Sequence, residues 1–140
     1  MIAVIRIHGR VGLNRDINET LNRMGIMQKY ACVVIPDTKV NLGMVKKVAN
    51  FVAFGEIDDG TFKELIEKRG KSIGNKKIDA SKVVEEIKKG KKYSEVGLKK
   101  FFRLHPARKG IDAKKHFGET KKAVLGNNKD KINDLIRRML

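Results

Sequence analysis

The chain has 140 residues, of which 41% are hydrophobic and only 6% aromatic, so it can build one compact core of modest size. Its 32 Lys and Arg residues against 16 Asp and Glu leave a net charge of +16, which indicates a polyanionic partner such as nucleic acid. No stretch is apolar for the roughly 18 residues that a membrane-spanning helix needs. The first ten residues also lack the pattern of a signal peptide, which predicts a cytoplasmic protein.

The first part of the chain alternates between extended and helical patterns. Strands are predicted in residues 2–8, 32–36 and 51–55, which are rich in β-branched and apolar side chains. Helices are predicted between them, in residues 14–24 and 41–50, where apolar residues recur every three or four positions. The resulting order is β-α-β-α-β.

Two details of this first part stay open. Asn14 and Asp16 are each suited to cap the first helix. The handedness of crossover connections would favour parallel pairing of the first two strands. Residues 25–31 are nevertheless long enough for the chain to run back before the second strand begins. The pattern alone therefore leaves the pairing of these strands undecided.

The second part of the chain, residues 58–140, has longer helical patterns and more charge. Helices are predicted in residues 58–70, 79–90 and 130–140. This part has 24 basic and 12 acidic residues and a net charge of +12, whereas the first part has 8 and 4 and a net charge of +4. Residues 99–122 contain nine basic and two acidic residues and form the most basic stretch.

The sequence FFRLH within this basic stretch predicts an extended segment. Alternation would place Phe101, Arg103 and His105 on one face. Phe102 and Leu104 would lie on the other face and point toward the core. Phe101 could stack on a base or pack within the protein, and the small number of phenylalanines favours packing.

The sequence shows no motif that is typical of a catalytic or metal-binding site. The histidines, His8, His105 and His116, have no carboxylate or cysteine at the spacing of metal ligands. The single cysteine, Cys32, lies among apolar neighbours and is interpreted as a buried hydrophobic residue. Residues 118–126 lack the Gly-Lys-Ser/Thr of a phosphate-binding P-loop. The sequence therefore predicts no enzyme, no catalytic residue, no metal site and no cofactor.

The sequence GRVG in residues 9–12 follows a predicted strand and precedes a predicted helix. Its glycines suit a plain turn, and they suit equally a close contact between the backbone and an RNA phosphate. A nucleotide cofactor is much less favoured, because the further glycine and the acidic residue of the dinucleotide-binding pattern are missing. The turn and the RNA contact both stay open.

Four stretches of the chain resemble one known family. The most specific is PDTKVNLGMVKKVANFVAFGEID in residues 36–58. It is joined by IRIHGRVGLNRDINETL in residues 5–21, GLKKFFRLHPARKG in residues 97–110 and INDLIRRML in residues 132–140. Together they resemble the large-subunit ribosomal protein family numbered thirty, in its long archaeal form. The resemblance covers nearly the whole chain.

The resemblance implies an α+β fold in two parts. Residues 1–57 would form a small β-α-β-α-β core that binds RNA, with a three-stranded antiparallel sheet backed by two helices, similar to a ferredoxin-like arrangement. Residues 58–140 would form a mainly helical C-terminal lobe. This lobe would include a short extended segment near residues 100–105 and a basic loop region.

The chain departs from the family's usual pattern in two loops. Ala107 replaces the second proline after LHP, which should leave the direction of Arg108 less fixed. Lys122 and Ala123 replace a glycine pair. Both departures concern the geometry of loops more than the identity of the family.

The resemblance implies a structural constituent of the large ribosomal subunit. Phosphate contacts would supply affinity for ribosomal RNA, and the shape of the RNA would supply specificity. The alternative is a free-standing basic protein that binds nucleic acid. The implied partners are large-subunit ribosomal RNA and neighbouring large-subunit proteins, with one copy per ribosome, no membrane and no small-molecule substrate. The candidate RNA-binding residues are Gly9, Arg10, Gly43, Met44, Lys46, Lys47, Arg103, His105, Arg108, Lys109, Lys114, Lys115, Lys121 and Lys122.

Overall fold

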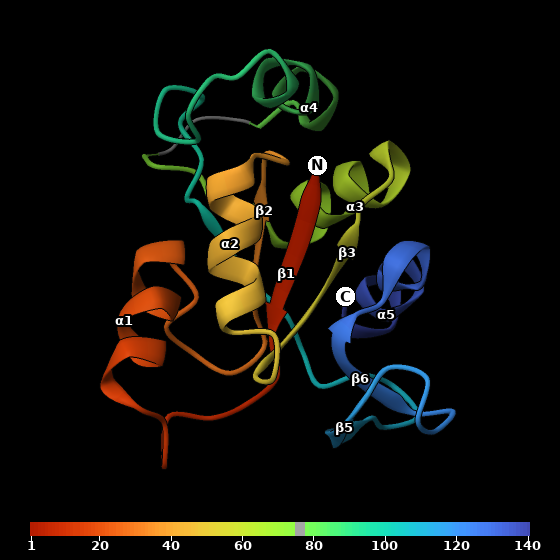
Figure 1. Ribbon diagram of the computed structural model, residues 1–140. Helices are drawn as coiled ribbons and strands as arrows, with labels where there is room; N and C mark the ends of the chain where they lie inside the picture. The colour runs from red at the N-terminus through yellow and green to blue at the C-terminus, as the bar shows by residue number, and fades with distance from the viewer. Residues whose placement is uncertain (75–77) are drawn as a thin grey trace.

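The structure is a computed structural model that describes residues 1–74 and 78–140. Within these residues, a six-stranded sheet in the order β4-β2-β1-β3-β6-β5 has helices on both faces (Figure 1). The strands are β1 (Ile2–Arg6), β2 (Ala31–Ile35), β3 (Val52–Glu56), β4 (Phe101–Arg103), β5 (Asp112–His116) and β6 (Ala123–Asn127). The helices are α1 (Arg15–Met24), α2 (Lys39–Lys47), α3 (Asp59–Arg69), α4 (Ala80–Lys88) and α5 (Ile132–Met139), with a 3-10 turn, η1 (Lys129–Lys131), before α5.

β1 is the central strand of the first part of the chain. It pairs antiparallel with β2, where Val4 lies opposite Val33, and antiparallel with β3, where Val4 lies opposite Phe54. Residues 25–30 carry the chain back along α1 before β2 begins. The pairing that the sequence left open is therefore antiparallel.

The expectation of a three-stranded sheet is wrong, although the mixed α+β class is confirmed. The second part of the chain adds β4 antiparallel to β2, and it adds β6 parallel to β3 with β5 parallel to β6. These additions pair edges of β2 and β3 that a three-stranded sheet would leave open. The C-terminal lobe contains the helices α3, α4 and α5, and it also supplies half of the strands that the structure describes.

The core has two layers, one on each face of the sheet. Alternate residues of β1 show this division, because Ile2 and Val4 pack with α1 and α2, whereas Ala3 and Ile5 pack with α3, α4 and α5. Burial on both faces explains why β1 and β2 are apolar without interruption except for Arg6. Cys32 is buried as predicted, and burial raises the pKa of its thiol to about 12.

The predicted helices of the first part form close to their expected bounds, and side chains mark their starts. The side chain of Asn14, not that of Asp16, caps α1 and accepts a hydrogen bond from the backbone N–H of Asp16. Gly25 ends α1 with φ +85°, a conformation that favours glycine. Thr38 caps α2, which therefore starts two residues before the predicted position. No helix in the described part of the chain is long and apolar enough to cross a membrane.

Candidate nucleic-acid interface

One end of the sheet gathers most of the predicted RNA-binding residues. Arg6, the last residue of β1, lies opposite Val52, the first residue of β3. β2 also begins there, and its first residue, Ala31, pairs with Arg103, the last residue of β4. β5 and β6 start on the same side, beyond these positions. We call this region the basic end; it comprises β5 and the loops of residues 7–14, 25–30, 48–51, 104–111 and 117–122 together with Arg103.

Most of the predicted RNA-binding residues belong to the basic end. They are Gly9, Arg10, Arg103, His105, Arg108, Lys109, Lys114, Lys115, Lys121 and Lys122. Lys46 and Lys47 form the last turn of α2 and lead into the loop of residues 48–51. Gly43 is exposed in the middle of α2, whereas Met44 packs against the core beneath α1 and α2. Met44 is therefore the weakest of the predicted contacts.

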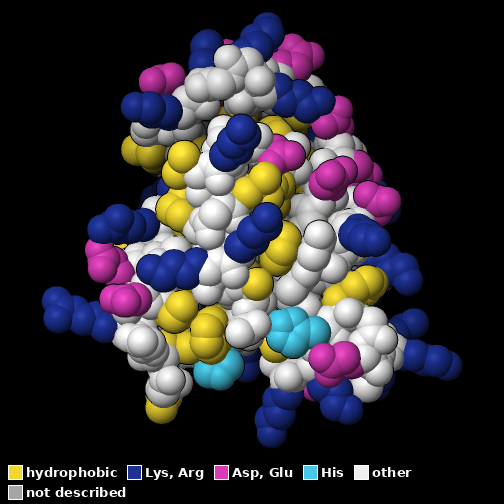
Figure 2. Space-filling view, in the orientation of Figure 1, with side chains coloured by type: hydrophobic (Ala, Val, Ile, Leu, Met, Phe, Trp, Pro, Cys, Tyr) yellow, Lys and Arg dark blue, Asp and Glu magenta, His cyan; other side chains and the backbone are white. Residues whose placement is uncertain are grey.

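The opposite end of the sheet carries acidic residues. Asp37 follows β2, Glu56 ends β3, and Asp58 caps α3. Asp37, Glu56 and Asp130 line a hollow of about 400 Å3 there, together with Lys129. Figure 2 shows acidic side chains along the upper right of the molecule and Lys and Arg side chains that project from its lower rim. Figure 2 also shows Lys and Arg side chains at the top of the molecule, so acidic and basic residues are mixed away from the basic end.

The cations of the basic end have no carboxylate partners in the described part of the chain. Among all the described residues, ion pairs join Arg23 to Glu19, Lys82 to Asp79, Lys88 to Asp59, Lys91 to Glu86, and Arg137 to Asp58 and Glu64. None of the predicted RNA-binding residues takes part in them. Their charges are therefore available to an external polyanion.

A buried arginine holds two loops of the basic end together. Arg6 is only 1% exposed, and its guanidinium donates hydrogen bonds to the backbone carbonyls of His8, Gly9, Ile26 and Met27 at 2.9 to 3.0 Å. Burial, and next the charge of Arg10, lower the pKa of Arg6 from its ordinary value. No carboxylate contacts this guanidinium among the residues described, so backbone carbonyls alone satisfy it. Arg6 thus fixes the position of the GRVG loop.

The GRVG loop presents an exposed arginine. The side chain of Arg10 donates from Nε to the carbonyl of Met27 at 2.9 Å. Gly12 has φ +76°, a turn conformation that favours glycine over other residues. Gly9 does not have a positive φ, and a Cβ atom there would meet nothing within 4 Å. The backbone at Gly9 is therefore open to a ligand, and no conformational requirement explains its lack of a side chain.

The structure joins this loop to the FFRLH segment. Arg10, Lys71, Phe101 and Arg103 line one hollow of about 450 Å3 beside β4. Phe102 is fully buried while Phe101 is 36% exposed, as the predicted alternation requires. Phe101 belongs to neither layer of the core. The prediction that it packs within the protein is therefore not met. Phe101 forms an aromatic surface in the same hollow as Arg10 and Arg103.

A second arginine holds the loop that follows Leu104. The side chain of Arg138, on α5, donates to the carbonyl of Arg108 at 2.9 and 3.1 Å and to that of Gly110 at 2.7 Å. The backbone N–H of Arg108 donates in turn to the carbonyl of Arg138 at 3.0 Å. Lys109, between them, has φ +66°. The loop is therefore fixed despite the missing second proline, and its two basic side chains are exposed.

β5 and the turn before β6 form the outermost part of the basic end. Lys114, Lys121 and Lys122 line a shallow hollow of about 570 Å3, which Asp112 also lines. Lys115 and His116 are also exposed on β5. Three lysines around one hollow are suited to surround a phosphate group.

Sequence reasoning missed three basic residues that shape this surface, Arg6, Lys71 and Arg138, and a fourth, Lys100, that lies just outside it. Lys71 lines the hollow beside β4, and the ammonium group of Lys100 lies 3.5 Å from the carbonyl of Arg23. Arg6, which is buried, and Arg138, which is half-buried, act through hydrogen bonds to backbone carbonyls. The one signal for Arg6 was a charge within an otherwise apolar strand; nothing in the sequence distinguished Arg138 from its neighbour Arg137.

Comparison with known proteins agrees with the resemblance found in the motifs. A family model described as ribosomal protein L30p/L7e matches residues 2–52. The chain is 38% identical to large ribosomal subunit protein uL30 of Methanococcus maripaludis, over 99% of this chain and 98% of that protein. It is 37% identical to uL30 of Archaeoglobus fulgidus over 99% of both chains, and 34% identical to uL30 of Methanosphaera stadtmanae over 100% of both.

Proposed function

Because the chain belongs to the uL30 family of large ribosomal subunit proteins, we propose that it is a structural component of that subunit and that its basic end binds ribosomal RNA. The observation that carries this proposal is the gathering of exposed cations at one end of the sheet without carboxylate partners in the described residues. Family membership favours this role over that of a free-standing nucleic-acid-binding protein, which would not sediment with the subunit.

Binding energy comes from phosphate neutralisation. Each Lys or Arg that meets a phosphate releases condensed counterions, which makes affinity high at low salt and steeply dependent on salt. Arg10 and Arg103 share the hollow beside β4 and form one group of contacts. Lys114, Lys121 and Lys122 share the other hollow and form a second group. The first group combines Arg10 from the first part of the chain with Arg103 from the second part, so both parts contribute to one surface.

Specificity comes from the fixed positions of these groups. The hydrogen bonds from Arg6 and Arg138 to backbone carbonyls hold the GRVG loop and the loop of residues 108–110 before RNA arrives. Preorganised loops lose little conformational entropy on binding and fit only one arrangement of phosphates. Phe101, partly exposed in the hollow that Arg10 and Arg103 also line, is suited to stack on an unpaired base. Gly12 forms part of a turn, and the open backbone at Gly9 leaves room for an RNA contact by the same loop.

The test of this function is a filter-binding titration with large-subunit ribosomal RNA of Methanococcus maripaludis at several salt concentrations. The double substitution Arg108→Ala and Lys109→Ala removes two exposed cations from the basic end. It should weaken binding and reduce the slope of log affinity against log salt by roughly 0.7 to 0.9 for each phosphate that these side chains neutralise.

The matched control is the double substitution Lys63→Ala and Lys82→Ala. These lysines lie away from the basic end, on α3 and α4, beside one hollow that also contains Glu67 and Asp79. The control removes the same net charge and should change the slope little. Equal slopes for the two double variants would contradict the proposed interface.

A further inference from the structure

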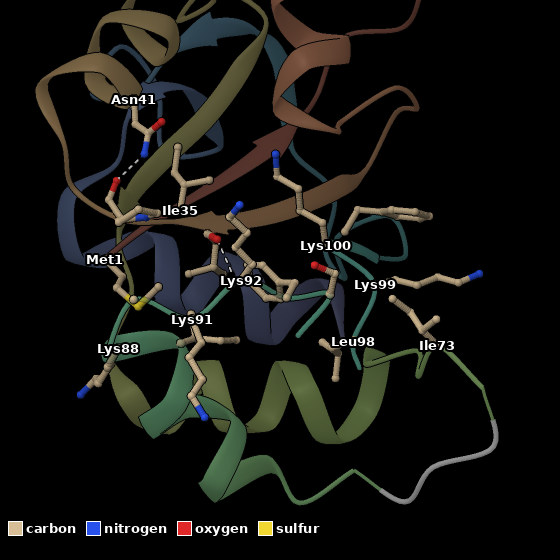
Figure 3. A pocket seen from close by; sticks show the side chains of 17 residues that line it. Met1, Ile35, Asn41, Ile73, Lys88, Lys91, Lys92, Leu98, Lys99 and Lys100 are labelled. Carbon is tan, nitrogen blue, oxygen red and sulfur yellow. Dashed lines mark hydrogen bonds between the residues drawn. The ribbon is translucent and has the colours of Figure 1, made fainter. Parts of the chain in front are cut away.

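A cavity of about 830 Å3 lies between the end of β2, the end of α4 and the segment that leads into β4, and it meets the hollow beside β4 at Phe101. Figure 3 shows the apolar side chains of Ile35, Ile73 and Leu98 around it, with Lys88 and Lys99 pointing outward from its margins. Ile73 is 49% exposed and Phe101, at the boundary with the hollow beside β4, is 36% exposed. Large apolar side chains that stay this exposed around a cavity indicate an interaction surface.

The walls of the cavity offer few free hydrogen-bonding side chains. The hydroxyl of Tyr93 donates to the carbonyl of Val34 at 2.7 Å, and the pKa of Tyr93 is raised by burial and next by Cys32. The amide of Asn41 donates to the carbonyl of Pro36 at 2.9 Å. A nucleobase placed here would leave its polar edge without partners, at a cost in free energy. The interior therefore suits aliphatic or aromatic side chains better than bases.

The rim of the cavity is positive. Lys88, Lys91, Lys92, Lys99 and Lys100 line it, and no Asp or Glu does so among the described residues. Lys88 pairs with Asp59 and Lys91 pairs with Glu86, whereas Lys92 and Lys99 have no carboxylate partner in the part of the chain that the structure describes. An occupant with its own carboxylates beside an apolar anchor would match both the rim and the walls.

We propose that this cavity is the docking site for a segment of a neighbouring protein in the large subunit, with apolar side chains in the cavity and Asp or Glu facing Lys92 and Lys99. The inference rests on the proposed ribosomal function. The volume is sufficient for several side chains, because a cavity of roughly 150 Å3 already holds a benzene ring. The protein would thus face RNA with one end of its sheet and another protein with this cavity.

The test is photo-crosslinking in purified large subunits that carry the full chain with benzoylphenylalanine in place of Ile73. We expect a cross-link to a protein segment in which apolar residues adjoin Asp or Glu, identified by mass spectrometry. A second probe in place of Glu67, exposed on α3, is the positional control and should not reach that segment. A cross-link from position 73 to ribosomal RNA, or to no molecule, would overturn the proposal.

Charge reversal separates this inference from the proposed function. The variant Lys92→Glu with Lys99→Glu should lower the yield of the protein cross-link at least about tenfold, because like charges across an interface repel. The variant Lys63→Glu with Lys82→Glu carries the same change in net charge and should leave that yield unchanged. If both variants retain the cross-link, the docking proposal fails, while the salt titration of the basic-end variants still decides the RNA proposal.

Discussion

Individual arginines in this protein have two different uses. Arg10 and Arg103 are exposed and line a hollow, whereas Arg6 and Arg138 direct their donors at backbone carbonyls of neighbouring loops. A guanidinium is suited to the second use, because it has five donors in a fixed plane and stays charged when buried. A count of basic residues therefore overestimates the number of side chains that are available to an external polyanion.

Replacement of Arg6 tests its internal role. Arg6→Met keeps much of the side-chain volume but leaves four backbone carbonyls without their donor, so it should lower the free energy of unfolding by about 2 to 4 kcal/mol. Arg6→Lys should recover part of this loss, since an ammonium group donates fewer hydrogen bonds. Urea unfolding followed by circular dichroism measures both changes.

Arg10→Ala is the control for this series, because Arg10 is exposed and makes one hydrogen bond to a carbonyl. Its effect on the free energy of unfolding should stay below about 1 kcal/mol. Equal losses in Arg6→Met and Arg10→Ala would show that Arg6 does not hold the loops.

At the scale of single residues, sequence reasoning succeeded where neighbours in the chain decide the outcome. The alternation of Phe101, Phe102 and Arg103 follows from local strand geometry and is observed. The role of Arg6 depends on carbonyls twenty positions away, at Ile26 and Met27. No local pattern contains that information.

Among the elements, the helices were easier to predict than the strands of the second part. The helices have apolar residues on one side and capping residues such as Asn14 and Asp58, which mark their starts. β5 has mostly exposed charged residues, and β6 is a short apolar run that includes Gly126. Neither strand shows the alternation that predicts a half-buried strand, because they form by pairing with each other and with β3.

Strands from both parts of the chain form one sheet. The predicted division into two domains, residues 1–57 and 58–140, stays a hypothesis. A chain that ends after Ile57 would expose the side of its sheet that packs with α3 and α5, including Ile5, Ile7 and Val34. We expect this truncated chain to lack cooperative unfolding in a thermal scan followed by circular dichroism, because fewer than sixty residues would be left with one of two core layers.

The full chain provides the reference for that scan and should unfold in one cooperative transition. A cooperative transition in the truncated chain would instead support an independently folding core, with the second part of the chain as an addition to it.

In the whole molecule, the pairing of the strands brings basic residues from distant parts of the sequence together at one end of the sheet. Arg10, Arg103 and Lys121 are far apart in the sequence, yet the ends of β1 and β4 and the start of β6 place them on one side. Composition predicted a polyanionic partner for this protein, and motifs indicated its family. The position of the surface could not be predicted, because it depends on β6, whose pairing with β3 the sequence did not reveal.

Cleavage of ribosomal RNA by iron-generated hydroxyl radicals within intact large subunits tests whether the basic end faces the RNA. The only native thiol, Cys32, is buried, so one iron chelate can be attached to each introduced cysteine. Glu119→Cys places the chelate in the turn before β6, at the basic end, and Ser81→Cys places it on α4. We predict strong cleavage of large-subunit RNA from position 119 and weak cleavage from position 81. Equal cleavage from the two positions, or stronger cleavage from position 81, would show that the basic end is not the surface that binds RNA.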